Sequence, residues 1–140
     1  MICDTGALFD YLVENAPDHG RFRNAIDQAR TRYIPGLVLA EVDYFLRDER
    51  RAMQVFMQDL ARGAFTYAPP TTGQLARAME VDRRFADLGL GLVDGSIVAL
   101  AESLDIRRLA TRDARHFAAV RLRDGRTFDL VVQPTAPDKS

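Results

Sequence analysis

The sequence predicts an α/β protein, a three-layer α/β/α sandwich around a mostly parallel sheet of four or five strands. Short apolar segments that read as strands alternate along the chain with longer segments whose apolar residues recur at helical spacing. Hairpin signals are few, so each strand is expected to reach the next through a helix, the connection that parallel strands need. A length of 140 residues, 47% of them hydrophobic, suits one domain with its own core.

The expected elements end where glycine, proline or polar residues interrupt an apolar pattern. Strands are expected at residues 1–4, 33–35, 64–68, 106–111 and 128–132. Helices are expected at residues 7–14, 20–30, 37–46, 50–62, 72–85 and 94–104. The helix at 37–46 is apolar all round except at Glu41 and Asp43, so it should be buried. The folded domain is expected to span residues 1–133, followed by a flexible tail at residues 134–140.

Composition limits the classes of protein and partner. A net charge of −1 gives no overall basic field of the kind that many nucleic-acid-binding proteins carry. All the basic residues except Lys139 are arginines, which bind phosphate through a planar fork, although a GC-rich coding sequence explains the same bias. Cys3, the single cysteine, excludes an intrachain disulfide and fits a reducing compartment. With no membrane-spanning run and no recognisable signal peptide, a cytoplasmic location is expected.

Four acidic residues are expected at one edge of the sheet. Asp4 ends the first strand, Asp113 follows the fourth, and Asp94 opens the helix that packs beside them, where it can cap free amides. Glu41 interrupts an apolar helix. Function in parallel sheets gathers at the carboxyl ends of the strands, so these acids are the candidates for a site. Taken singly, each has an ordinary structural interpretation as a cap, a turn residue or a buried ion-pair partner.

A cluster of four carboxylates needs compensation. At a separation of about 5 Å and an effective dielectric near 20, each pair repels by roughly 3 kcal/mol. The cluster must therefore take up protons, recruit arginines or bind a cation. Oxygen ligands without cysteine or histidine suit Mg²⁺ or Mn²⁺, which can activate a water and hold a phosphodiester for in-line attack.

The order and spacing of four short motifs resemble the PIN-domain ribonucleases, specifically the VapC-type toxins of bacterial toxin–antitoxin pairs. The motifs are Asp4-Thr5, Ala40-Glu41, Gly91-x-x-Asp94-x-x-Ile97-x-Ala99 and Leu109-x-Thr111-x-Asp113-x-x-x-Phe117. The resemblance covers nearly the whole chain. It implies a metal-dependent endoribonuclease that hydrolyses RNA phosphodiester bonds as the toxin of a type II toxin–antitoxin system.

The resemblance also assigns roles to residues and names partners. It implies that Asp4, Glu41, Asp94 and Asp113 are catalytic and bind Mg²⁺ or Mn²⁺, with Thr5, Ser96 and Thr111 as supporting hydroxyls. The implied partners are RNA, a VapB-like antitoxin whose C-terminal segment covers the acidic site, and a second copy of the chain in a homodimer. No membrane partner is expected.

Two positions depart from the family pattern. Phe117 follows the last acid by four residues, where three is usual. Gly6 stands where a serine or asparagine is common, so no side chain at position 6 can support the site.

Apolar helix residues are the candidates for the two partner surfaces. The homodimer is expected to use the apolar residues of the helices at 37–46 and 50–62, namely Tyr44, Phe45, Leu46, Met53, Phe56 and Met57. The antitoxin is expected to pack on the first two helices, around Phe9, Leu12, Phe22 and Ile26.

Other functions fit the sequence less well. A histidine-based nuclease would need paired acid and base histidines, but His19 lies in a Pro-Asp-His-Gly loop and His116 in the turn after the last acid. A haloacid-dehalogenase-type phosphotransferase needs a second aspartate at position 6, and receiver-like acids and a phosphate-binding loop are absent. The main alternative is a catalytically inactive PIN-like module that binds RNA or a protein.

Overall fold

In residues 1–131, which the computed structural model describes, five parallel strands form one sheet in the order β3-β2-β1-β4-β5. The strands are β1 (Ile2–Cys3), β2 (Tyr33–Pro35), β3 (Thr66–Ala68), β4 (Arg108–Ala110) and β5 (Asp129–Leu130). Strand β2 matches its expected range, and the other four are shorter than expected, since their flanking residues lie outside the ladder of paired strands. The prediction of a mostly parallel sheet of four or five strands is confirmed.

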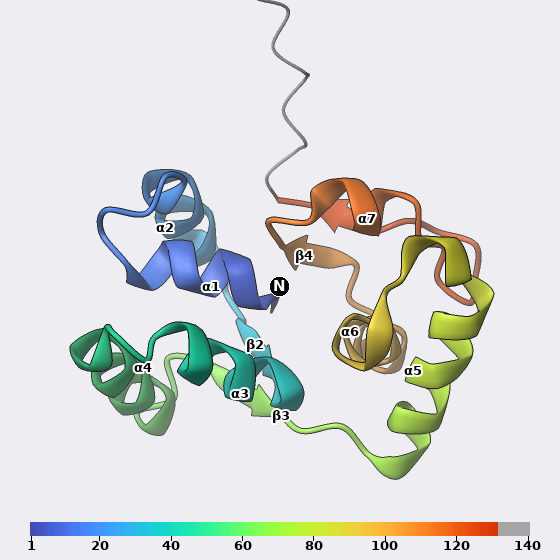
Figure 1. The fold of residues 1–140 in the computed structure, drawn as a ribbon, viewed down its shortest axis with the longest axis horizontal. Coiled ribbons are helices and arrows are strands. Elements are labelled where there is room, and N and C mark those ends of the chain that lie inside the picture. The colour runs from blue at the N-terminus through green and yellow to red at the C-terminus, as the bar shows by residue number, and fades with distance from the viewer. Residues whose placement is uncertain (132–140) are drawn as a thin grey trace, which may run out of the picture.

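Helices cover both faces of the sheet. In the described residues they are α1 (Thr5–Leu12), α2 (His19–Gln28), α3 (Gly36–Phe45), α4 (Arg50–Ala61), α5 (Thr72–Arg84), α6 (Gly91–Leu104) and α7 (Ala114–Ala118), with a 3-10 turn η1 (Ala86–Leu88) before α6. Helices α1–α4 lie on one side of the sheet and α5 and α6 on the other (Figure 1). The expected three-layer sandwich is confirmed.

The centre of the sheet is dry on both faces, as helix-covered parallel sheets require. Ile2 and Cys3 of β1 are fully buried, and so are Leu109 and Ala110 of β4 beside it. Burial raises the pKa of the Cys3 thiol to about 12, so the group stays protonated and packs as a small apolar residue.

Helices α5 and α6 pack closely against each other. The Thr71 hydroxyl accepts a hydrogen bond from the Gln74 amide while the Gln74 side chain accepts one from the Thr71 amide, which fixes the start of α5. At Gly95 of α6, a Cβ atom would lie 2.4 Å from the carbonyl oxygen of Ala78. Only glycine permits this approach, which sets the position of α6 and the acid it carries.

Two helices begin two or three residues earlier than expected. Helix α1 begins at Thr5 rather than at residue 7, because Asp4 caps it by accepting a hydrogen bond from the Thr5 amide. Helix α6 begins at Gly91 rather than at Asp94, and Asp82 accepts the Gly91 amide at 2.9 Å. The prediction that Asp94 caps this helix is therefore wrong, since Asp94 lies within its first turn, three residues after the start.

A short helix, α7, was not expected after the fourth strand. His116 lies in this helix and not in a turn. Phe117 anchors α7 to the core, because its ring is fully buried and stacks edge-on against Phe128 with 5.5 Å between ring centroids.

The expectation that the helix at 37–46 is buried is only half right. Its inner face, with Val38 and Val42, is in the core. Tyr44 and Phe45 on the outer face are 61% and 51% exposed.

No helix within residues 1–131 combines the length and the apolar character needed to cross a lipid bilayer. The tail expected at residues 134–140 lies outside the described residues.

Candidate active site

A pocket of about 630 Å³ is lined by all four acids singled out from the sequence. Asp4 follows β1, Asp113 follows β4, Glu41 lies in α3 and Asp94 in the first turn of α6. Strand ends from the centre of the sheet and two helices from opposite faces therefore supply one acidic surface. This is the edge at which α/β proteins place their chemistry.

Asp4 is the most constrained of the four. Its side chain is buried, and both carboxylate oxygens accept hydrogen bonds, Oδ1 from the Thr5 amide and Oδ2 from the Thr111 hydroxyl, each at 2.7 Å. The Asp4 amide donates to the Ala110 carbonyl at 2.9 Å, which ties the end of β1 to β4. Its position is thus fixed from both neighbouring elements.

Two threonine hydroxyls connect three of the acids. The Thr5 hydroxyl donates to Glu41 Oε1 at 2.7 Å, so the residue whose amide binds Asp4 also orients Glu41. The Thr111 hydroxyl, besides donating to Asp4, accepts the Asp113 amide at 3.0 Å. Thr5 and Thr111 therefore lie where supporting hydroxyls were predicted.

Asp94 differs from the other acids because no hydrogen bond holds its carboxylate within the described residues. It is half buried against Asp4, Glu41 and Asp113. Burial raises the pKa of Asp94 to about 7, and the charges of Asp4, Asp113 and Glu41 add to the shift.

The same forces act on Asp4, where hydrogen bonds oppose them. Burial raises the pKa of Asp4 to about 6, while the hydrogen bonds from Thr111 and Thr5 favour its charged form. The charges of Asp113 and Glu41 contribute to this raised pKa. The raised carboxylate pKa values expected for a cluster without a metal are present at both Asp4 and Asp94.

The donor chemistry of the pocket suits a hard divalent cation, because four carboxylates supply oxygen ligands only. Across residues 1–131, however, no three His, Cys, Asp or Glu side chains are already gathered closely enough to hold an ion. Like charges disfavour closer approach, and the hydrogen bonds from Thr5 and Thr111 direct oxygens of Asp4 and Glu41 toward the protein. The residues fit the cation by chemical type, and binding it requires the side chains to converge.

The remaining predicted or discounted residues lie elsewhere. The Ser96 hydroxyl donates to the Val93 carbonyl at 2.6 Å rather than to a carboxylate, so the contact expected of it is not formed. The ring of His19 bonds through Nδ1 to the Asp10 carbonyl at 2.8 Å. Neither His19 nor His116 lines the acidic pocket.

Sequence reasoning missed one pair at this site. Asp10, an acid of an amphipathic helix, has a side chain that is only 1% exposed, and it forms an ion pair with Arg112, which lines the acidic pocket. A signal was present in the sequence, because Gly6 lies one helical turn before Asp10 on the same face of α1. A glycine there leaves space for another side chain to reach the acid.

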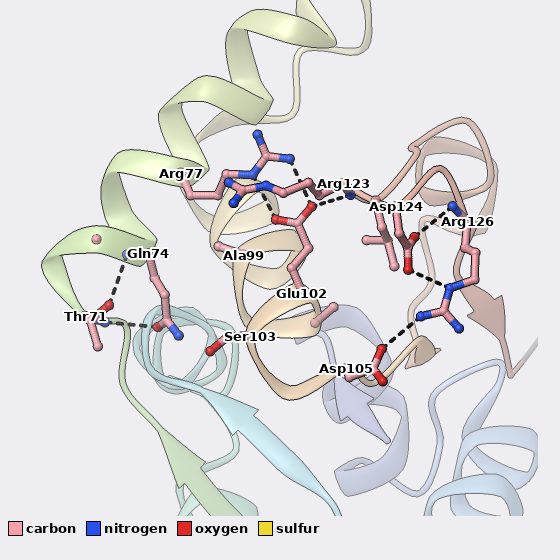
Figure 2. Close-up of a pocket in the computed structure, with 13 residues that line it drawn as sticks. Thr71, Gln74, Arg77, Ala99, Glu102, Ser103, Asp105, Arg123, Asp124 and Arg126 are labelled. Atoms are coloured by element: carbon pink, nitrogen blue, oxygen red, sulfur yellow. Dashed lines mark hydrogen bonds and ion pairs between the residues drawn. The ribbon is translucent and has the colours of Figure 1, made fainter.

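Figure 2 shows a second pocket, at the other end of α6, whose charged groups pair with one another. Arg77 binds both oxygens of Glu102, at 2.8 and 2.9 Å, and the Arg123 amide donates to the same carboxylate at 2.7 Å. Burial alone would raise the pKa of Glu102, but these hydrogen bonds hold it below its ordinary value. These acids are neutralised within the chain, whereas those of the first pocket are not.

Comparison with known proteins agrees with this geometry. The family model described as PIN domain matches residues 1–122. The protein "Ribonuclease VapC26" of Mycobacterium tuberculosis is 31% identical over 134 residues, which cover 94% of this chain and 99% of that protein. The crystal structure of Mycobacterium tuberculosis VapC20, described as a sarcin–ricin loop cleaving toxin, superposes with a TM-score of 0.70 at 16% identity, over 77% of this chain and 85% of that one.

Proposed function

Since the chain belongs to the PIN-domain family and, within it, to the VapC-like ribonuclease toxins, we propose that it is a Mg²⁺- or Mn²⁺-dependent endoribonuclease. It acts as the toxin of a type II toxin–antitoxin pair. One observation carries the proposal. All four acids line one pocket, and no arginine of the described chain forms an ion pair with any of them. We propose residues 1–133 as the nuclease domain, with residues 134–140 as a tail.

Asp4, Glu41, Asp94 and Asp113 would hold the cation. When bound, Mg²⁺ or Mn²⁺ would supply a water of lowered pKa and positive charge for the phosphate under attack. Thr5 and Thr111 orient the carboxylates of Asp4 and Glu41 and the backbone of Asp113. Such fixed hydrogen bonds reduce the reorganisation that the reaction requires.

Asp94 has a distinct role in this scheme. Its carboxylate oxygens have no hydrogen-bond donor in the described residues, and burial beside three other acids raises its pKa to about 7. In the metal-free chain this carboxylate is therefore partly protonated at neutral pH. A bound cation would favour its charged form, so we propose that Asp94 is the acid whose charge depends most on the cation.

The proposed partners are RNA, a VapB-like antitoxin and a second copy of the chain. The exposed side chains of Tyr44, Phe45 and Met57 on α3 and α4 support the homodimer. The other apolar residues expected there, Leu46, Met53 and Phe56, are core residues and cannot take part. Tyr44 stacks edge-on against Phe45 with 5.6 Å between ring centroids, which makes one continuous aromatic surface.

The surface expected to bind the antitoxin must also be smaller than predicted. Phe22 and Ile26 of α2 are buried in the core, so they are closed to a partner. Phe9 and Leu12 of α1 are partly exposed, and Phe9 lines the acidic pocket. An antitoxin segment that covers the acidic site could therefore contact Phe9 but not Phe22 or Ile26.

Cleavage of total RNA by the purified chain tests the function. The wild-type chain should cut RNA in Mg²⁺ or Mn²⁺ and lose this activity in EDTA, and Asp94→Asn should be inactive while folded. The alternative, an inactive PIN-like module that binds RNA or protein, predicts RNA binding without cleavage under any of these conditions.

A further inference from the structure

A positively charged side chain, that of Arg112, lies at the acidic pocket but forms no ion pair with its four acids. Arg112, between Thr111 and Asp113, lines the pocket. Its guanidinium donates from Nε to Asp10 Oδ2 at 2.9 Å and from Nη2 to Asp10 Oδ1 at 2.5 Å. Among the described residues, Arg112 pairs with Asp10 and with none of the four acids.

The two side chains of the Asp10–Arg112 ion pair differ strongly in solvent exposure. The Asp10 side chain is 1% exposed and the Arg112 side chain 47%. By contrast, Arg77 and Glu102 are half-buried to a similar extent, with side chains 16% and 13% exposed, and form a closed structural pair. Asp10 therefore acts as a fixed anchor at the base of the guanidinium, whose other edge faces outward.

The outward edge keeps unused donors. A guanidinium carries five N–H groups in a planar fork, and Asp10 takes two of them. The other three, two of them on Nη1, have no acceptor among the described residues. Such a fork matches the oxygens of a phosphate, and the bond to Asp10 has already fixed its orientation.

Two neighbouring residues, Gly6 and Phe9, determine the space that the Arg112 side chain occupies. A Cβ atom at Gly6 would lie 3.0 Å from the Arg112 Cβ and 3.4 Å from its Nε, so a serine or asparagine there would press on the side chain. The ring of Phe9 lies 5.5 Å from the guanidinium carbon and limits movement on that side. The departure at Gly6 thus has a physical reason, since it makes room for Arg112.

We propose that Arg112 binds a phosphate oxygen of the RNA strand at the edge of the acidic pocket, and that Asp10 and Gly6 position it for this contact. The inference rests on the proposed function. It adds a fixed positive charge for the substrate backbone to a pocket whose other charges are negative.

Metal-free RNA binding tests the proposal without any cleavage. The probe is a fluorescein-labelled single-stranded RNA 12-mer, titrated in EDTA between about 50 and 200 mM salt. Arg112→Gln should weaken binding about tenfold and reduce the slope of log Kd against log salt by about 0.7, the value for one phosphate contact on single-stranded nucleic acid. Arg108→Gln is the control, because the Arg108 side chain is about as exposed as that of Arg112 and pairs with Asp129, at 2.9 Å, at the opposite end of β4.

Further variants separate substrate binding from folding. Arg112→Gln leaves the buried carboxylate of Asp10 without its partner, which could destabilise the fold. The double variant Asp10→Asn with Arg112→Gln removes both charges and so avoids this unpaired charge. The double variant should fold and show the same loss of RNA affinity. Asp10→Asn alone and Gly6→Ser should weaken RNA binding by smaller factors and leave the salt slope unchanged, since the charge remains but is less well positioned.

Mn²⁺ affinity, measured by calorimetry, distinguishes a substrate contact from support of the acidic cluster. Arg112→Gln should bind Mn²⁺ as well as the wild type or better, because a positive charge has been removed. The proposal is overturned if Arg112→Gln binds RNA as the wild type does, if Arg108→Gln loses as much affinity, or if Mn²⁺ affinity falls with RNA affinity. Failure of the wild type to cleave in Mg²⁺ would instead count against the proposed nuclease activity and leave the salt-slope result to decide on Arg112.

Discussion

The Thr111 hydroxyl donates a 2.7 Å hydrogen bond to Asp4 Oδ2 across 107 positions of the chain. The same oxygen of Thr111 accepts the Asp113 amide, so one buried side chain connects the acids at the ends of two adjacent strands. A hydroxyl that donates to one group and accepts from another has no apolar substitute. The relative positions of Asp4 and Asp113 are therefore fixed by the pairing of β1 with β4 and by Thr111.

Thr111→Val tests this connection, since valine keeps the shape and removes the hydroxyl. We expect the free energy of unfolding to fall by about 1–3 kcal/mol, because Asp4 is buried and loses a donor. The pKa of Asp4 should rise further, since that hydrogen bond favours the charged form. Urea denaturation measures the first effect, and Thr66→Val at an exposed position of β3 is the control. Equal losses in both variants would contradict a specific role for Thr111.

Stability should depend on pH in a direction set by Asp4 and Asp94. Their pKa values are raised from 3.8 to about 6 and about 7, so between about pH 4 and 7 the folded state binds more protons than the unfolded state. The free energy of unfolding of the metal-free protein should therefore fall as pH rises through this window and level off above it. Thermal melts in EDTA from pH 5 to 8 measure it. A Tm that rises over this range would show that the acids are not mutually destabilising.

Asp94→Asn should give a more stable but inactive protein. The substitution removes a half-buried charge that has no hydrogen-bond donor in the described residues, so we expect a gain on the order of 1 kcal/mol at pH 8, about 3 °C in Tm. Asp4→Asn is a less clean variant, because the amide replaces an oxygen that accepts from Thr111. Calorimetry in EDTA measures the gain. Loss of both activity and folding in Asp94→Asn would indicate a structural acid.

The proposed homodimer depends on the aromatic surface of α3. Phe45→Glu places a charge beside Tyr44 on that surface and should shift the chain to a monomer in sedimentation at micromolar concentration. Met79→Glu, at a position of α5 that is 42% exposed, introduces the same charge on the other side of the sheet and should leave the dimer intact. A wild-type chain that sediments as a monomer would contradict the homodimer.

Much of the fold follows from local signals in the sequence. Alternation of apolar segments and the lack of hairpins predict the parallel sheet. An acid within three residues of the end of an apolar strand marks the edge where Asp4 and Asp113 lie. Helix starts were predicted less well, because their caps are not all local. Gly91 begins α6 with a φ of 79° and an amide bound by Asp82, nine residues earlier.

The sequence also did not predict which individual side chains are buried. Asp10 looks like a surface acid in the sequence. In the fold, the segment after β4 places Arg112, 102 positions further along the chain, against it. Phe22 and Ile26 look like a partner surface, yet both are buried in the core of the folded chain. For Asp10 the decisive neighbour is distant in sequence, and only the three-dimensional structure identifies it.

Cleavage of total RNA by metal-stripped protein, with and without added Mg²⁺, tests the nuclease assignment most directly. We expect the wild-type chain to cut RNA only after Mg²⁺ is restored, and folded Asp94→Asn to remain inactive at every Mg²⁺ concentration. Wild-type cleavage that persists in EDTA, or an Asp94→Asn variant that cuts RNA at the wild-type rate, would contradict a nuclease built on these four carboxylates.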